Sequence, residues 1–210
     1  CHAGMMSSGD QVDDYHQTWG PSINPGLAPV TYPRVTKAME VEDIQDVTRG
    51  FAAAATYIQR GGMDGVEIHA AHGYLLGQFM SSLTNKRTDG YGGSLENRMR
   101  FTLEVIEAVR AVVGKDFTMG VRISGDEFCP GGIVLEDSKQ MAKLMEQTGK
   151  IDYINVSGGS SWSVIGIISI LPMSFPPGLY LHLSAGIKEV VTSIPIFGIG
   201  PRITDPILAE

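Results

Sequence analysis

The chain has 210 residues, of which 43% are hydrophobic and 19% are charged, a composition typical of a globular protein with a sizeable core. A formal net charge of −7, without any cluster of Lys and Arg, argues against a nucleic-acid partner or an anionic membrane surface. No apolar run reaches the roughly 18 residues that a membrane helix needs. The two cysteines, Cys1 and Cys129, lack CxxC spacing, so we expect a reducing, cytoplasmic compartment and no disulfide framework.

The first 40 residues predict little regular structure. Residues 6–40 are rich in Ser, Gly, Asp and Pro and show no sustained period, which is typical of a long excursion loop. Loops of this length in a compact domain are usually functional, so we expect this loop to cover the site. The sequence does not begin with Met and ends in what resembles the first turn of a helix, so we expect a piece of a longer protein.

From residue 42 onward, strand and helix patterns alternate. Apolar residues at helical spacing predict helices over residues 42–60, 95–113, 135–147 and 182–192, and short apolar runs predict strands over 65–70, 118–123, 153–156 and 194–199. Such alternation gives a parallel sheet with right-handed crossovers. We count five strands if a stub at residue 1 is included. A five-stranded open sheet of the flavodoxin type would also fit this count.

A polar cluster follows the strand at residues 65–70. His69, His72, Gly73 and Tyr74 come within six residues, and a long loop then leads to Ser94, which begins the next helix. In β/α proteins the carboxyl ends of the strands are where catalytic residues are placed. Taken singly, a histidine or a tyrosine here is more often a packing residue. A metal site is disfavoured, because HAAH lacks the Glu of HExxH and stands at a strand end.

Two runs within this segment, HAAHGYLLGQF and LTNKRTDGYGGSLENRMRF, form a specific pattern. Together they resemble the signature of the old yellow enzyme family (NADH:flavin oxidoreductases), the FMN-dependent ene-reductases and their multidomain relatives. The resemblance implies a (β/α)8 TIM barrel with FMN across the carboxyl ends of its strands. The chain would then be a partial FMN-binding barrel domain over residues 1–210, a fragment covering about strands three to seven, with strands one, two and eight missing.

The resemblance also implies the catalytic residues. His69 and His72 would donate hydrogen bonds to the carbonyl oxygen of an activated alkene, and Tyr74 would protonate the α-carbon from the opposite face. Two donors aimed at a developing enolate oxygen act as an oxyanion hole, and a positioned phenol is a plausible acid. Gly73 lets the chain turn, so we expect all three side chains to face the barrel mouth.

Arg122 is the first predicted cofactor residue. An arginine within an apolar strand is costly unless it is paired. The resemblance implies that Arg122 stabilises the negative N1–C2 edge of reduced flavin. The alternative is a buried ion pair with Asp126 or Glu127.

Gly200 and Arg202 are the predicted phosphate residues. With the helix start at Thr204, they resemble the family's Gly-Arg-Ile-Thr-Asp-Pro element, and backbone N–H groups at such a site bind phosphate. Pro201 stands between them here, and proline donates no N–H, so one phosphate contact is lost. The second phosphate-binding Gly-Arg pair of the family would lie beyond Glu210. We therefore expect the chain as given not to bind FMN tightly and to be inactive by itself.

The sequence thus predicts an FMN-dependent oxidoreductase that uses NAD(P)H to reduce the activated C=C bond of a small enone or enoate. An N-demethylase, an amine dehydrogenase or a dienoyl-CoA reductase on the same barrel remain alternatives. A 4Fe–4S cluster and FAD would belong only to a C-terminal extension. The dienoyl-CoA branch uses a histidine where this chain has Ser160, Ser161 and Trp162. A non-catalytic barrel fragment without cofactor is the alternative from another class of protein. The joint presence of four predicted site side chains argues against it: His69, His72, Tyr74 and Arg122.

Overall fold

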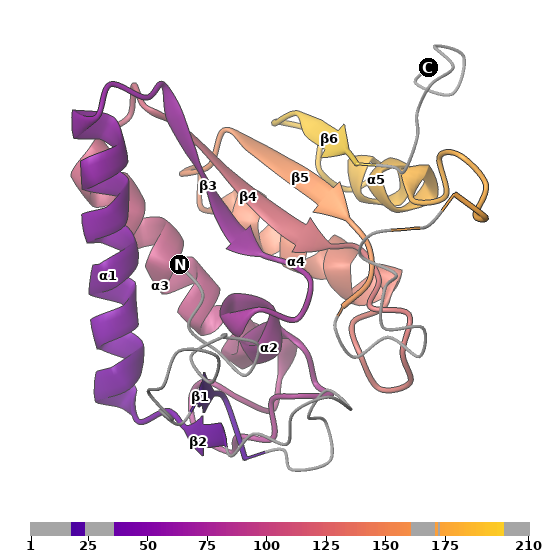
Figure 1. Cartoon of the computed structure of the whole chain (residues 1–210), viewed down its shortest axis with the longest axis horizontal. Helices are drawn as coiled ribbons and strands as arrows, with labels where there is room; N and C mark the ends of the chain where they lie inside the picture. Colours follow the sequence, from indigo (N-terminus) through magenta and orange to yellow (C-terminus); the bar gives the residue numbers. More distant parts are fainter. Residues whose placement is uncertain (1–17, 24–35, 161–170, 172, 200–210) are drawn as a thin grey trace.

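A four-stranded parallel sheet is the centre of the fold. The computed structural model describes residues 18–23, 36–160, 171 and 173–199. The sheet has the order β3 (Gly65–Ala70), β4 (Thr118–Ser124), β5 (Tyr153–Ser157) and β6 (Ile196–Gly198), so each strand pairs with the next one along the chain (Figure 1). This confirms the predicted parallel β/α arrangement. The predicted stub at residue 1 lies outside the described residues.

The helices connect and cover these strands. α1 (Val41–Arg60) precedes β3, α3 (Leu95–Val113) joins β3 to β4, α4 (Leu135–Gln147) joins β4 to β5, and α5 (Leu181–Lys188) precedes β6. α3 and α4 have the predicted bounds, and in the view of Figure 1 α4 lies behind the sheet while α3 lies between α1 and the sheet. α1 packs along α3. No helix in the described part of the chain combines the length and the apolar character needed to cross a bilayer.

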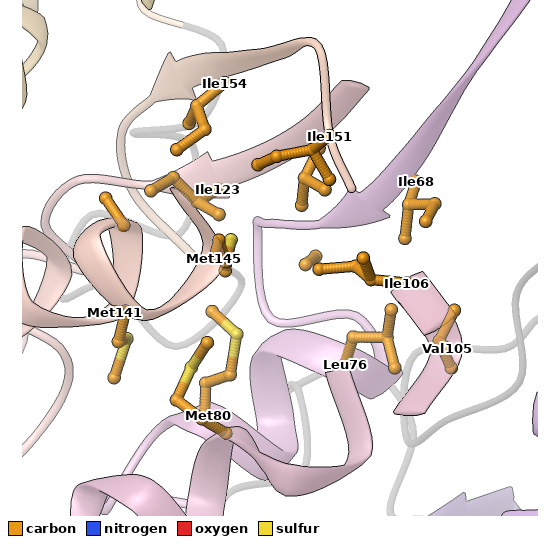
Figure 2. Packing of buried hydrophobic residues seen from close by; sticks show 14 of the residues in the cluster. Ile68, Leu76, Met80, Val105, Ile106, Ile123, Met141, Met145, Ile151 and Ile154 are labelled. Atoms are coloured by element: carbon orange, nitrogen blue, oxygen red, sulfur yellow. The ribbon is translucent and has the colours of Figure 1, made fainter. Parts of the chain in front are cut away.

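The core lies between these helices and one face of the sheet. Every second strand residue points into it, and Ile68, Ile123 and Ile154 are at most 2% exposed. Figure 2 shows Ile123 and Ile154 on the side of the methionines of α2 and α4, and Ile68 beside Ile106 of α3. The core cluster contains Met80, Met141 and Met145, which are all fully buried. The sheet is therefore fixed by its apolar face, and its other face is left for polar residues.

The structure corrects two predicted elements. The segment after Tyr74, expected to be loop, forms the short helix α2 (Leu75–Met80), all six residues of which are buried. α5 ends at Lys188 rather than at residue 192. Its expected continuation contains the β-branched run Val190-Val191-Thr192, which disfavours helix. The Glu146 carboxylate accepts hydrogen bonds from the backbone N–H groups of Thr192 and Ser193, and so holds the chain in a turn.

Two short strands lie outside the main sheet. β1 (Thr18–Gly20) pairs in parallel with β2 (Thr36–Ala38). Both fall within the excursion loop predicted for residues 6–40, of which only residues 18–23 and 36–40 are described. The extent of that loop, and the proposal that it covers the site, therefore stay predictions.

Candidate active site

The face of the sheet opposite the core carries a row of polar side chains. In the strand register, His69 of β3 is opposite Arg122 of β4, which is opposite Asn155 of β5. Residues in register on parallel strands point to the same face. One step earlier in the same strands are Glu67, Gly120 and Tyr153. The row of His69, Arg122 and Asn155 lies close to the carboxyl ends of the strands, where a β/α barrel binds its ligands.

Three predicted catalytic side chains gather at the carboxyl end of β3. The ring centroids of His69 and His72 are 5.2 Å apart, in an edge-on arrangement. The Tyr74 ring centroid is 5.0 Å from that of His69. Tyr74 is the N-cap residue of α2, so this helix, which the sequence did not predict, sets the position of the tyrosine. The structure therefore brings the predicted trio together.

His72 is held firmly in an unusual backbone conformation. Its φ angle is 59°, in the left-handed region that few residues other than glycine adopt. Its backbone N–H donates to Ser124 Oγ at 2.9 Å, and that hydroxyl donates to the Gly159 carbonyl at 2.8 Å. The ring Nε2 lies 2.8 Å from Ser157 Oγ. Contacts from the ends of β4 and β5 thus offset the backbone strain and fix the ring.

The environment of His72 also sets its charge. Burial and the positive charge of Arg122 lower the pKa of His72 to about 4. The imidazole is therefore neutral near pH 7 and carries one N–H. Ser157, by donating to Nε2 or accepting from it, decides which ring nitrogen bears the proton.

Arg122 has a partner that the sequence did not predict. Its Nε donates to Glu67 Oε1 at 2.7 Å, and the two side chains are 32% and 24% exposed. The alternative of an ion pair with Asp126 or Glu127 is therefore wrong. Glu127 is instead buried and accepts from Ser81 Oγ at 2.6 Å. Arg122 thus pairs with a residue of the neighbouring strand, one layer below its own, and not with the acidic residues close to it in sequence.

Sequence reasoning missed Glu67 and Asn155 as site residues. Asn155 Nδ2 donates to Glu67 Oε2 at 2.8 Å, so Glu67 links β4 and β5 from β3. The available signal was alternation, because Asn155 and Ser157 are the polar positions of an otherwise apolar strand, as Glu67 and His69 are in β3.

The loop after α2 acts as a brace. Asn85 Nδ2 donates to the carbonyl groups of Phe79 and Tyr91, at 2.7 and 2.8 Å. Arg98, at the start of α3, donates from Nε to the Met80 carbonyl at 2.8 Å. Ser94 caps α3 by accepting from the Asn97 N–H. These contacts tie α2, and with it Tyr74, to α3.

The remaining predicted residues cannot be placed. Gly200 and Arg202, the predicted phosphate residues, lie outside the described residues. Within the described ranges, no group of three or more His, Cys, Asp or Glu side chains is arranged to hold a metal ion.

Comparison with known proteins adds a family match. Residues 3–165 match the NADH:flavin oxidoreductase / NADH oxidase family. The chain is 42% identical over 207 residues to an N,N-dimethylglycine/sarcosine dehydrogenase of Chromohalobacter salexigens, covering 98% of this chain and 29% of the relative. It is 36% identical to a multifunctional alkene reductase/demethylase OYE of Caballeronia cordobensis, covering 90% of this chain and 28% of the relative. The chain thus spans less than a third of these curated relatives.

Solved structures agree with this match. A 2-naphthoyl-CoA reductase in complex with 2-naphthoyl-CoA superposes with a TM-score of 0.83 at 31% identity, over 92% of this chain and 28% of that protein. An old yellow enzyme homologue from Zymomonas mobilis superposes with a TM-score of 0.72 at 28% identity, over 95% of this chain and 54% of that protein. These matches confirm the predicted fold class, part of a (β/α)8 barrel of the old yellow enzyme type.

The polar face fits the flavin that this family implies. Arg122 uses only Nε in its ion pair, and no acceptor for Nη1 or Nη2 is recorded among the described residues. Asn155 is 8% exposed, and its Oδ1 is a buried acceptor without a hydrogen-bond partner among the residues that the structure describes. Buried polar atoms in proteins are nearly always paired. A ring system that presents both acceptors and a donor, as the pyrimidine edge of a flavin does, would satisfy both side chains.

Proposed function

The chain belongs to the NADH:flavin oxidoreductase / NADH oxidase family, and we propose that the protein is an FMN-dependent enzyme that uses NAD(P)H to reduce the activated C=C bond of an enone or enoate. The observation that carries this proposal is the cluster of His69, His72 and Tyr74 rings at the carboxyl end of β3. The charge of Arg122 reaches this cluster, because it contributes to the lowered pKa of His72.

The two histidines bind and polarise the substrate in this proposal. His72 is neutral near pH 7, so it acts as a hydrogen-bond donor and not as an acid. With His69 beside it, it stabilises the negative charge that develops on the substrate carbonyl oxygen. The bonds of His72 to Ser124 and Ser157 hold this donor ready before the substrate arrives.

Tyr74 supplies the proton. Its ring packs against His69, and its backbone caps α2, so its hydroxyl is carried on a fixed element. The proton passes from the phenol oxygen to the α-carbon of the substrate. Bound FMN supplies the hydride chemistry between NAD(P)H and the substrate. A 4Fe–4S cluster and FAD enter this proposal only as parts of a C-terminal extension.

Amine oxidation is the second candidate. It is favoured by the relative that shares 42% identity over nearly the whole chain, an N,N-dimethylglycine/sarcosine dehydrogenase. Another relative is named for both alkene reduction and demethylation. The same polar face would then bind a small amine that reduces the flavin in place of NAD(P)H.

A pair of anaerobic reactions separates the two candidates. The full-length protein, loaded with FMN, is first reduced with NADH or NADPH and then mixed with cyclohexenone. Return of the oxidised flavin spectrum supports alkene reduction. In the second reaction, oxidised protein is mixed with N,N-dimethylglycine alone. Bleaching there, without any return of colour by cyclohexenone in the first reaction, would contradict alkene reduction and favour amine oxidation.

A further inference from the structure

Glu67 contacts two other polar side chains of the sheet face, Arg122 and Asn155. The proposed roles of His69, His72 and Tyr74 do not require it. It lies in the middle of β3, one layer below His69. Its Oε1 accepts from Arg122 Nε at 2.7 Å and its Oε2 accepts from Asn155 Nδ2 at 2.8 Å. One carboxylate therefore holds side chains from two neighbouring strands with separate oxygens.

The other residues of the same layer, Gly120 and Tyr153, lie beside this carboxylate. A Cβ at Gly120 would lie 2.1 Å from the Tyr153 ring, so the absence of a side chain there lets the ring cross the strand. Burial and the nearby Glu67 carboxylate raise the pKa of Tyr153. Tyr153 also packs edge-on against Phe197 with ring centroids 5.1 Å apart. Glu67 thus has an aromatic neighbour in its own layer and two hydrogen-bond donors, from Arg122 and Asn155.

Holding Arg122 by Nε determines where its other donors point. A guanidinium is a planar fork, so fixing one N–H fixes the plane of the group. Nη1 and Nη2 remain available, since no acceptor for them is recorded within the described residues. The ion pair also offsets part of the positive charge that Arg122 presents on this face.

The same carboxylate determines the orientation of Asn155. A carboxylate can only accept, so the amide must turn Nδ2 toward Glu67 and Oδ1 away from it. That Oδ1 is buried and has no hydrogen-bond partner in the part of the chain that the structure describes. Glu67 therefore leaves the Oδ1 acceptor of Asn155 and the Nη1 and Nη2 donors of Arg122 free of partners among the described residues, so they can bind a ligand.

We propose that Glu67 is a positioning residue that orients Arg122 and Asn155 against the pyrimidine edge of FMN and, by offsetting the charge of Arg122, holds down the reduction potential of the flavin. The inference rests on the proposed FMN-dependent function and deepens it. Reduced flavin carries negative charge at its N1–C2 edge, so an uncompensated Arg122 would favour the reduced form.

The test is the reduction potential of bound FMN in the full-length protein, measured against a reference dye. Glu67→Gln removes the charge at nearly constant volume, and we expect reduced FMN to be favoured about tenfold over oxidised FMN, a rise of about 30 mV for a two-electron couple. Glu67→Asp keeps the charge but moves it away from Arg122, so it should give a smaller rise. Glu189→Gln breaks an exposed ion pair with Lys139 and is the matched control, with no change expected.

The outcomes separate this inference from the function on which it rests. An unchanged or lowered potential in the Glu67 variants, with FMN bound, would overturn the role of Glu67 and leave the flavin enzyme intact. If Glu67→Gln does not fold, an unchanged potential in Glu67→Asp is enough to overturn it. A wild-type protein that binds no FMN at all would instead contradict the proposed function. A change in FMN affinity alone, without a change in potential, indicates mere structural support and also overturns the inference.

Discussion

The two faces of the β3–β6 sheet differ in almost every respect, although the same strands make both. One face is apolar, at most 2% exposed at residues such as Ile68 and Ile123, and packs on helices. The other carries Glu67, Arg122 and Asn155 in a connected polar network. Because side chains alternate along a strand, stability and chemistry occupy alternate positions. Substitutions on the apolar face should therefore lower the free energy of unfolding, and substitutions on the polar face should alter function.

The largest effect is expected at the polar end of β3. Tyr74→Phe should slow the reduction of cyclohexenone by about 10²- to 10⁴-fold, because a general acid contributes about that much. Reduction of the bound flavin by NAD(P)H should stay unchanged, since it needs no proton from Tyr74. Anaerobic rapid mixing measures the two half-reactions separately. An equal loss in both would mean that Tyr74 is not the acid.

The apolar face should respond in the opposite way. Ile123→Ala truncates a fully buried side chain next to Arg122 in the sequence, and we expect a loss of about 2–5 kcal/mol in the free energy of unfolding. Urea denaturation measures this loss, and the potential of bound flavin should not move. Val112→Ala, at an exposed position of α3, is the control and should change stability by less than about 0.5 kcal/mol. A similarly small effect for Ile123→Ala would refute the assignment of this face to the core.

Gly120 tests the polar face by packing, because the Tyr153 ring leaves no room for a side chain at this position. A methyl group there would overlap the Tyr153 ring, so Gly120→Ala should destabilise by about 1–3 kcal/mol. Gly50 in α1 has no atom within 4 Å of an added Cβ. Gly50→Ala should therefore stabilise the protein by about 0.5–1 kcal/mol. Thermal or urea unfolding of the two variants gives opposite signs if Tyr153 crosses β4 as described, and the same sign if it does not.

A pH dependence completes the comparison. The pKa of His72 is about 4 in the folded protein, below its ordinary value of 6.5, because burial disfavours the charged imidazole. The unfolded chain then binds more protons between these values, so the contribution of His72 to stability is full above pH 6.5 and is lost as the pH falls toward 4. His72→Asn removes the titration, and Asn tolerates a positive φ. Its stability should fall less than that of the wild type over this range. Parallel curves would show that His72 is not buried in the neutral form.

The sequence predicted those elements whose apolar residues recur at helix or strand spacing. α3 is bounded as expected because its apolar positions recur at helical spacing from Ser94 to Gly114. α2 was missed because its six residues are all buried and show no polar face. The predicted end of α5 was too late. Glu146, which is far away in sequence, accepts a hydrogen bond from the Thr192 N–H and so holds this segment outside the helix, and the local sequence does not show such a contact.

The candidate site was predicted where it depended on neighbours in sequence. His69, His72 and Tyr74 are brought together by one strand end and one turn. Glu67 was missed as the partner of Arg122, because it is 55 positions away and becomes a neighbour only through strand pairing. The ion pair with Asp126 or Glu127, which was only the alternative for Arg122, rested on their closeness in sequence. Whether Gly200 and Arg202 bind phosphate stays a prediction.

The most direct test of the two-faced sheet is a visible absorption spectrum of the full-length protein, purified without added flavin. The polar face offers the Nη1 and Nη2 donors of Arg122 and the Oδ1 acceptor of Asn155 to a ligand. It therefore predicts that the purified protein shows the flavin absorption bands and releases FMN on denaturation. Arg122→Met should weaken FMN binding without lowering the free energy of unfolding of the flavin-free protein. A colourless protein that stays colourless after incubation with FMN would contradict the account.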